Sequence, residues 1–274
     1  MKGGYPLRID FHTHVFPDKL AEKALTSISE HTGAPYFTNG TVADTDEKLK
    51  EWNVDSSVAL HIATNPKQQY NVNTWAAEIQ TEKRFCFGSI HPDAPDALSE
   101  LERIKTLGLY GVKLHPYFQS FNIDDKKMFP IYDCISSLKL PLLLHVGFDP
   151  SYPGATEGVP QRLITVLENF PHLTMIAAHM GGLGCYQEAQ TYLLGKPIYI
   201  DTAIASQFLT PELFHHMVSK HDSQRILFGS DCPWSPSLDE AKLIEQSNLS
   251  SEQLESIFYK NAQRVLHIQK IGKL

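Results

Sequence analysis

Eight short apolar runs rich in β-forming residues recur along the chain and alternate with segments of helical periodicity. The predicted strands are residues 7–11, 57–62, 85–90, 110–114, 141–146, 173–178, 198–202 and 226–229. Between them, apolar residues follow a helical spacing, most clearly over residues 96–107 and 129–138. Strands that alternate with helices form parallel sheets. The alternation is therefore compatible with two architectures, an open doubly wound sheet and a closed (β/α)8 barrel.

The chain is expected to form a single domain over its whole length, because no Gly/Ser-rich linker, charge block or internal repeat divides it. Near its end, Ser250 and Ser251 with Glu252 and Glu255 resemble a capped helix start. The apolar residues that would form the buried stripe of this C-terminal helix are Leu254, Ile257, Phe258, Ala262, Val265 and Leu266.

Composition excludes several classes of protein. Apolar residues make up 42% of the chain and charged residues 20%, which is typical of a soluble globular protein and not of a disordered one. The formal net charge of −7 provides no basic surface that could neutralise phosphates, so we expect no nucleic-acid partner. No stretch approaches the roughly 18 uninterrupted apolar residues of a membrane span, so we expect no membrane partner.

The cysteines indicate a reducing environment. Cys86, Cys134, Cys185 and Cys232 lie far apart and form no CxxC pair, which is typical of reduced thiols and not of a disulfide framework. The N-terminal segment MKGGYPLRIDFHTH has no apolar core of a signal peptide. We therefore expect a cytoplasmic protein. The apolar faces of its helices are also compatible with a homo-oligomer.

Histidines gather where the predicted strands end. Of the 13 histidines, seven lie at or just beyond these C-terminal ends: His12, His14, His61, His91, His115, His145 and His179. In parallel α/β folds the carboxyl ends of the strands meet at the ligand-binding face. We therefore predict an active site there. For His61 and His91 no motif decides between a packing role and contact with the substrate.

His12 and His14 are two residues apart, so a strand directs both imidazoles to the same side. Neutral imidazoles bind divalent metals, and a catalytic site keeps one coordination position open. An HxH pair alone is as compatible with two packing histidines as with a metal site. The side chain of Asp10 is expected on the same side of the strand as that of His12. Other histidines end apolar strands in LLLHVG and IAAHMGG, and both observations favour the metal site.

Asp231 follows the last predicted strand directly, in ILFGSDCPW. The eighth strand adjoins the first only if the sheet closes, so a metal site shared by Asp231 and the HxH pair requires the closed barrel. We therefore predict a (β/α)8 barrel of eight parallel strands with surrounding helices. The alternative for a lone aspartate at this position is a helix cap.

Five fragments together resemble the amidohydrolase superfamily, in particular its amidohydrolase-related, or amidohydrolase 2, group of metal-dependent barrel hydrolases. They are DFHTHVFP, GVKLHPYF, LLLHVG, AAHMGG and FGSDCPW, at the ends of the first, fourth, fifth, sixth and eighth predicted strands. The closing IFYKNAQRVL is also similar to the last helix of the family. The resemblance implies four ligands for one divalent metal ion: His12, His14, His145 and Asp231. It also implies that His179 acts beside the metal.

The ion expected from these ligands is Zn²⁺, although Mn²⁺, Fe²⁺ or Co²⁺ would also suit them. Some members of the superfamily carboxylate a lysine of the fourth strand to bridge two metals, which raises the same question for Lys113. We favour one metal, with Lys113 either binding a substrate carboxylate or pairing with an interior acid. His115 faces as Lys113 does and is expected to help bind the substrate.

The resulting hypothesis is hydrolysis of an ester, lactone or amide bond of a small molecule by a metal-activated water. Asp231 would accept the water proton, and His179 would polarise the carbonyl group. Two alternatives stay open: non-oxidative decarboxylation of an aromatic or unsaturated carboxylic acid by the same residues, and a non-catalytic metal-binding protein. The substrate would be selected by rim loops at residues 35–40, 117–123 and 148–158.

Overall fold

The structure is a computed structural model that describes residues 7–268. Its eight parallel strands form one sheet in chain order, from β1 to β8, and the predicted (β/α)8 barrel class is confirmed. The strands are β1 (Ile9–Thr13), β2 (Ser56–Leu60), β3 (Arg84–Gly88), β4 (Gly111–Leu114), β5 (Leu142–Leu144), β6 (Met175–Ala177), β7 (Tyr199–Asp201) and β8 (Ile226–Leu227). Each strand overlaps one predicted apolar run.

Helices follow the strands, as the alternation predicted. The α-helices are α1 (Asp18–Thr32), α2 (Val42–Glu51), α3 (Gln69–Ile79), α4 (Ala97–Thr106), α5 (Phe129–Ser137), α6 (Leu163–Asn169), α7 (Tyr186–Tyr192), α8 (Pro211–Ser219), α9 (Ser237–Gln246), α10 (Ser251–Glu255) and α11 (Asn261–Val265). Short 3-10 turns lie at η1 (Lys126–Met128), η2 (Pro160–Arg162), η3 (Ala205–Gln207) and η4 (Ser223–Arg225). None of the helices within residues 7–268 combines the length and hydropathy that crossing a bilayer requires.

The chain divides into two compact units. Of the described residues, unit 1 comprises residues 7–59 and 201–268, and unit 2 comprises residues 60–200. In unit 1 the first strand has a neighbour on each side. β1 pairs with β2 in parallel, and Thr13 of β1 also bridges to Cys232, just after β8. Backbone hydrogen bonds from Phe11 to Phe228 (2.7 Å) and from His14 to Cys232 (2.6 Å) join the first strand to the last.

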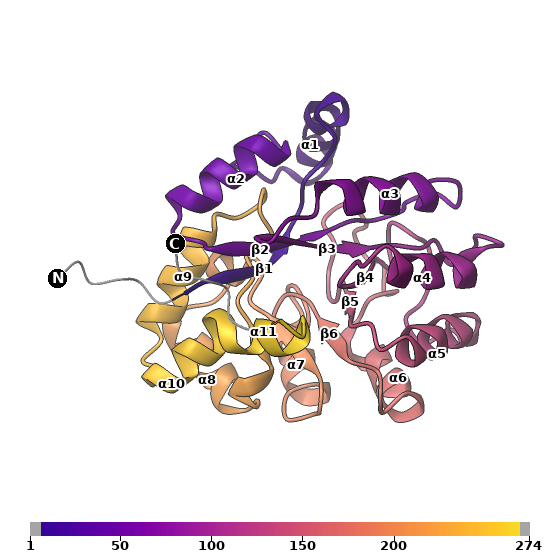
Figure 1. Cartoon of the computed structure of the whole chain (residues 1–274). Coiled ribbons are helices and arrows are strands. Elements are labelled where there is room, and N and C mark those ends of the chain that lie inside the picture. Colours follow the sequence, from indigo (N-terminus) through magenta and orange to yellow (C-terminus); the bar gives the residue numbers. More distant parts are fainter. Residues whose placement is uncertain (1–6, 269–274) are drawn as a thin grey trace. The chain divides into compact units, whose positions relative to one another are not determined.

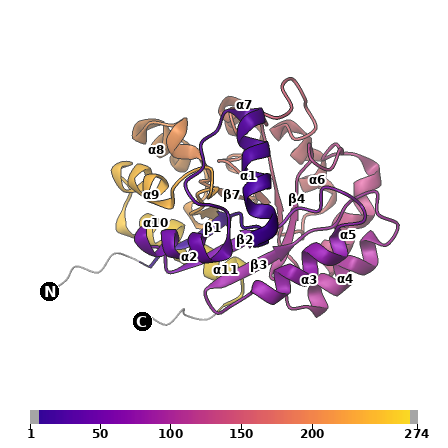
Figure 2. The same cartoon turned by 90° about the horizontal axis from the view of Figure 1, so that it is seen from above.

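Unit 2 contains the central strands of the sheet. β3 to β6 pair in parallel in chain order. Ala177 of β6 in turn pairs with Ile200 of β7. Helices α3, α4 and α5 lie side by side along these strands (Figures 1 and 2). The strands are buried along their whole length from β3 to β6, as expected of a parallel sheet covered by helices.

The C-terminal helix begins where the sequence predicted. Ser250 caps it in a capping box with Gln253, which takes the place of the acidic residues expected there. The helix then continues through the π-helical turn η5 (Ser256–Lys260) into α11. All the residues of the predicted stripe are buried except Leu254, which is half-buried.

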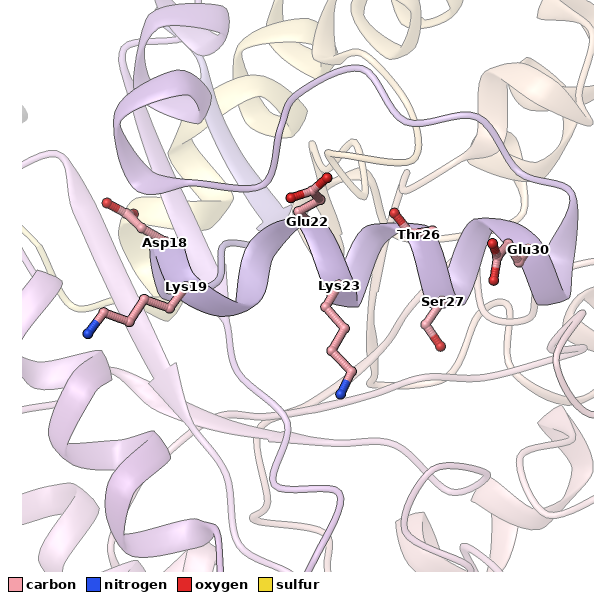
Figure 3. Close-up of a pocket in the computed structure, with 7 residues that line it drawn as sticks. All are labelled: Asp18, Lys19, Glu22, Lys23, Thr26, Ser27 and Glu30. Carbon is pink, nitrogen blue, oxygen red and sulfur yellow. The ribbon is translucent and has the colours of Figure 1, made fainter.

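A shallow surface runs along the exposed side of α1, outside the histidine positions. Figure 3 shows the seven side chains that line it, all from this one helix: Asp18, Lys19, Glu22, Lys23, Thr26, Ser27 and Glu30. Their mixed charges are typical of a solvated helix face, and they include no histidine.

Candidate metal centre

In unit 1, three polar side chains converge at the junction of the first and last strands. Nε2 of His12 lies 3.2 Å from Oδ1 of Asp231, and Nε2 of His14 lies 3.1 Å from the same oxygen. His12 is the penultimate residue of β1 rather than a residue beyond it, so the predicted strand end is corrected by two residues. Asp231 follows β8 and adopts a left-handed backbone conformation with φ 69°, which its short polar side chain tolerates.

A fourth residue, Asp201 at the end of β7, was not among the predicted site residues. Its Oδ2 lies 2.8 Å from Nδ1 of His12, and both side chains are fully buried. A carboxylate at this distance holds the proton on Nδ1, so Nε2 of His12 presents a lone pair toward Asp231. The sequence did contain a signal, because Asp201 ends the seventh apolar run as Asp231 follows the eighth.

This arrangement fits a divalent cation. A lone pair of His12 and a carboxylate oxygen of Asp231 repel each other unless a positive charge lies between them. The ring planes of His12 and His14 are inclined by 69°, so their Nε2 lone pairs can point at one ion. Bonds of about 2.0–2.1 Å to one ion place neighbouring donors about 2.9–3.4 Å apart, which includes the distances observed here.

Asp10 accepts hydrogen bonds from the backbone of both segments that carry the site. Its Oδ1 accepts hydrogen bonds from the backbone N–H groups of His12 (3.1 Å) and Ser230 (3.0 Å), and its Oδ2 accepts one from the hydroxyl of Ser237 (2.6 Å). Burial raises the pKa of Asp10, although these hydrogen bonds oppose the shift. Asp10 therefore fixes the backbone on both sides of the pair formed by His12 and Asp231.

In unit 2, His145 and His179 follow β5 and β6. Nδ1 of His145 lies 3.0 Å from Nε2 of His179, with the ring planes inclined by 64°. Nε2 of His145 donates to the carbonyl oxygen of Phe148 at 3.2 Å, which leaves Nδ1 with the lone pair. His179 is buried and has φ 60°, so a left-handed turn after β6 sets the direction of its side chain.

His115, after β4, lies against the same histidine but cannot share a metal ion with it. Donor atoms of His115, His145 and Asp149 lie within 4.8 Å of one another. The rings of His115 and His145, however, are stacked, with centroids 4.2 Å apart and planes inclined by only 19°. Imidazole lone pairs lie in the ring plane, so two stacked rings do not aim at one ion.

The nitrogens of His115 already have partners in the protein. Nε2 lies 3.4 Å from Oδ2 of Asp149, and Nδ1 accepts the backbone N–H of Phe118 at 3.4 Å. The ring of Phe118 also stacks on the ring of His115, with centroids 4.1 Å apart. The two faces of the His115 ring are therefore covered by the rings of Phe118 and His145.

The remaining predicted positions lie in buried surroundings. Lys113 is a residue of β4 and only 1% exposed. Nδ1 of His61 donates to the carbonyl oxygen of Phe87 at 2.9 Å, and Nδ1 of His91 accepts the backbone N–H of Asp93 at 3.2 Å. These contacts agree with the packing interpretation of His61 and His91 and leave Nε2 of each ring outside them.

A β/α barrel with histidines and aspartates after its strands defines a class of barrel proteins suited to binding a metal. Within that class, the family model described as amidohydrolase matches residues 9–268. The chain belongs to this amidohydrolase family, as the five fragments indicated.

Solved structures show the same fold. An uncharacterized TIM-barrel protein from Bordetella bronchiseptica is 19% identical, with a TM-score of 0.75 over 95% of this chain and 98% of that chain. The 5-carboxyvanillate decarboxylase from Sphingomonas paucimobilis is 15% identical, with a TM-score of 0.71 over 97% of this chain and 100% of that chain. A dihydroxybenzoic acid decarboxylase from Polaromonas, with bound manganese and the inhibitor 2-nitroresorcinol, is 16% identical, with a TM-score of 0.72 over 96% and 97%.

Proposed function

We propose that this protein is an enzyme that binds one divalent metal ion through His12, His14, His145 and Asp231. The observation that carries the proposal is the approach of both Nε2 atoms of the HxH pair to one oxygen of Asp231, at 3.2 and 3.1 Å. His145, in unit 2, is proposed as the fourth ligand because the fragment LLLHVG resembles the family's metal-binding fragment. The bound ion would act as a Lewis acid and lower the pKa of a coordinated water.

The reaction that we propose is the loss of CO2 from a small planar carboxylic acid without oxidation. Two of the similar barrels are decarboxylases of aromatic acids. Unit 2 also presents a stack of the Phe118, His115 and His145 rings, with centroids 4.1 and 4.2 Å apart. Flat ring faces of this kind suit a planar ligand.

Each residue has a proposed role in this reaction. The bond between the ring carbon and the carboxylate carbon breaks, its electron pair stays on the ring carbon, and a proton takes the place of CO2. Asp231 would deliver that proton from its carboxyl group, and His179 would hold a substrate oxygen. Lys113 would pair with a substrate carboxylate, and His115 would help to bind the substrate.

Hydrolysis of an ester, lactone or amide bond is the second candidate. It is favoured by the amidohydrolase family match and by the position of His179, whose Nε2 lies 3.0 Å from the proposed ligand His145. In this reaction Asp231 would take a proton from water as the water oxygen attacks the carbonyl carbon. His179 would then stabilise the charge that develops on the carbonyl oxygen.

The identity of the metal is part of the proposal. Histidine and aspartate donors favour Zn²⁺ but accept Mn²⁺, the ion bound in the similar Polaromonas enzyme. We also propose a cytoplasmic location, where the four free cysteines would stay reduced.

Metal analysis and a substrate screen on the same preparation test the proposal. The protein is stripped with a chelator and reloaded with Zn²⁺ or Mn²⁺. It is then assayed for CO2 release from hydroxybenzoates and for hydrolysis of esters, lactones and amides. We expect one ion per chain and CO2 release that disappears with the chelator and returns with the metal.

Hydrolysis products alone would decide for the second candidate. A protein that holds the ion but turns over no substrate would favour a non-catalytic metal-binding role, and one that holds no stoichiometric ion would contradict the metal site.

A further inference from the structure

Glu240, on the first turn of α9, is a buried acid that the proposed chemistry does not use. Its Oε2 accepts the backbone N–H of Ser206 at 2.8 Å. Its Oε1 accepts the hydroxyls of Ser206 at 2.5 Å and of Ser235 at 2.7 Å. The side chain is 0% exposed, so the two carboxylate oxygens are engaged entirely by groups of unit 1.

The two serines belong to the loops that carry the aspartates of the site. Ser206 lies in η3, in the segment that follows Asp201, and Ser235 lies in the segment that follows Asp231. Each segment is fixed at its beginning by the strand and at its far end by Glu240. Glu240 therefore ties together the two loops whose aspartates contact His12 from opposite ring nitrogens.

Other hydrogen bonds also join the two loops directly. The backbone N–H of Ile204 donates to the carbonyl oxygen of Ser230 at 3.1 Å, and the side chain of Gln207 donates to the carbonyl oxygen of Trp234 at 3.1 Å. Glu240 offers one carboxylate to both loops. Because Ser206 contributes its hydroxyl and its backbone N–H, the loop after β7 is held in direction as well as in position.

We propose that Glu240 is a positioning residue of the metal centre, which holds Asp201 and Asp231 in register on the two nitrogens of His12. The inference rests on the proposed metal site and deepens it. Partners that orient the ligands of a metal commonly change its affinity about 10- to 100-fold when they are lost. Glu240 does not contact a proposed ligand and acts through the two loops. Its replacement is therefore expected to reduce the metal affinity by a factor at the lower end of that range.

The test measures the affinity of the whole protein for Mn²⁺ or Zn²⁺ and its thermal unfolding in the presence of a chelator. For Glu240→Ala we expect about tenfold weaker metal binding. For Glu240→Gln we expect affinity within about threefold of wild type, because the amide oxygen can accept the N–H of Ser206 while the amide N–H₂ donates to the hydroxyls. The matched control is Glu245→Ala, which breaks the ion pair of Arg8 with the same helix and should leave metal affinity unchanged.

A folded Glu240→Ala protein with wild-type metal affinity would overturn the inference while leaving the metal site intact. If that variant does not fold, the double variant Ser206→Ala and Ser235→Ala removes two of the three contacts without a buried cavity at Glu240. Unchanged metal affinity in the double variant would overturn the inference equally, and weakened affinity supports it. A wild-type protein without affinity for either ion would overturn the proposed function, and the inference with it.

Discussion

Oδ2 of Asp201 lies 2.8 Å from Nδ1 of His12, and this contact determines which nitrogen of His12 faces Asp231. The two residues are separated by 189 positions in the sequence, and the closure of the sheet brings them together. The consequence is chemical, because a histidine that holds its proton on Nδ1 has the Nε2 lone pair that a metal requires.

Replacing Asp201 with asparagine should therefore weaken metal binding. An amide can donate to Nδ1 as well as accept from it, so the tautomer that presents the Nε2 lone pair is no longer enforced. We expect affinity for Zn²⁺ or Mn²⁺ to fall about 10- to 100-fold, measured by competition with a chelating dye. The matched control is Asp239→Asn, an exposed acid of unit 1 that pairs with Lys242. Equal affinities for wild type and Asp201→Asn would show that the contact does not control the tautomer.

Asparagine at position 231 tests the proton transfer. The amide keeps the shape of the side chain and one oxygen donor but cannot carry the proton. We expect turnover to fall by about 10²- to 10⁴-fold, the range typical of a lost general acid or base. Bound metal has to be measured on the same sample, because Asp231 is also a proposed ligand. Near-wild-type turnover by an Asp231→Asn protein with its full metal content would exclude the role of Asp231 as acid or base.

Methionine at position 113 separates the interpretations of Lys113. Methionine preserves much of the length of this buried side chain and removes its charge and its amine. If Lys113 binds a substrate carboxylate, KM should rise at least about 30-fold while the metal content stays at one ion per chain, since removing one partner of a buried hydrogen-bonded charge pair costs about 2–5 kcal/mol. A fall from two ions to one in the variant would instead show that Lys113 bridges a second metal. An unchanged KM and metal content would leave Lys113 a structural partner of an interior acid.

The sequence predicted the architecture well because the architecture rests on local patterns. Apolar runs and helical spacing placed the strands and the α4 and α5 helices within a few residues. The end of β1 was misplaced because His12 and Thr13 are held as strand by neighbours on both sides, including the bond from Thr13 to Val58. A single-strand pattern contains no information about such neighbours.

The site was predicted less completely, for a related reason. His12, His14 and Asp231 could be identified because their types and positions are distinctive, and the structure brings these three together within unit 1. Asp201 and Glu240 act through other residues, and their roles depend on contacts across long stretches of sequence. Glu240 in particular has the sequence position of an ordinary acid in the first turn of a helix, while the fold buries it.

The burial of Glu240 also predicts how stability depends on pH. Desolvation raises the pKa of Glu240 from 4.5 to about 8, against the lowering effect of its hydrogen bonds to the two serines, and the charge of buried Asp10 adds to the rise. Because the pKa is higher in the folded state, the proton on Glu240 stabilises the fold fully below about pH 4.5. That contribution is lost progressively as the pH rises toward 8.

Glutamine at position 240 cannot ionise and should not lose stability in this way. We expect the Tm of Glu240→Gln, relative to wild type, to increase as the pH rises from 4.5 to about 8, between the unfolded and folded pKa values, and to level off above that. Thermal unfolding is followed in a chelator, so that metal binding does not contribute. The control is Glu245→Gln on the same helix, whose carboxylate is 40% exposed and whose difference from wild type should change little over this interval. Parallel pH curves for wild type and Glu240→Gln would mean that Glu240 is already ionised in the folded protein at pH 5. Its carboxylate would then be stabilised by the donors of Ser206 and Ser235 more strongly than burial destabilises it.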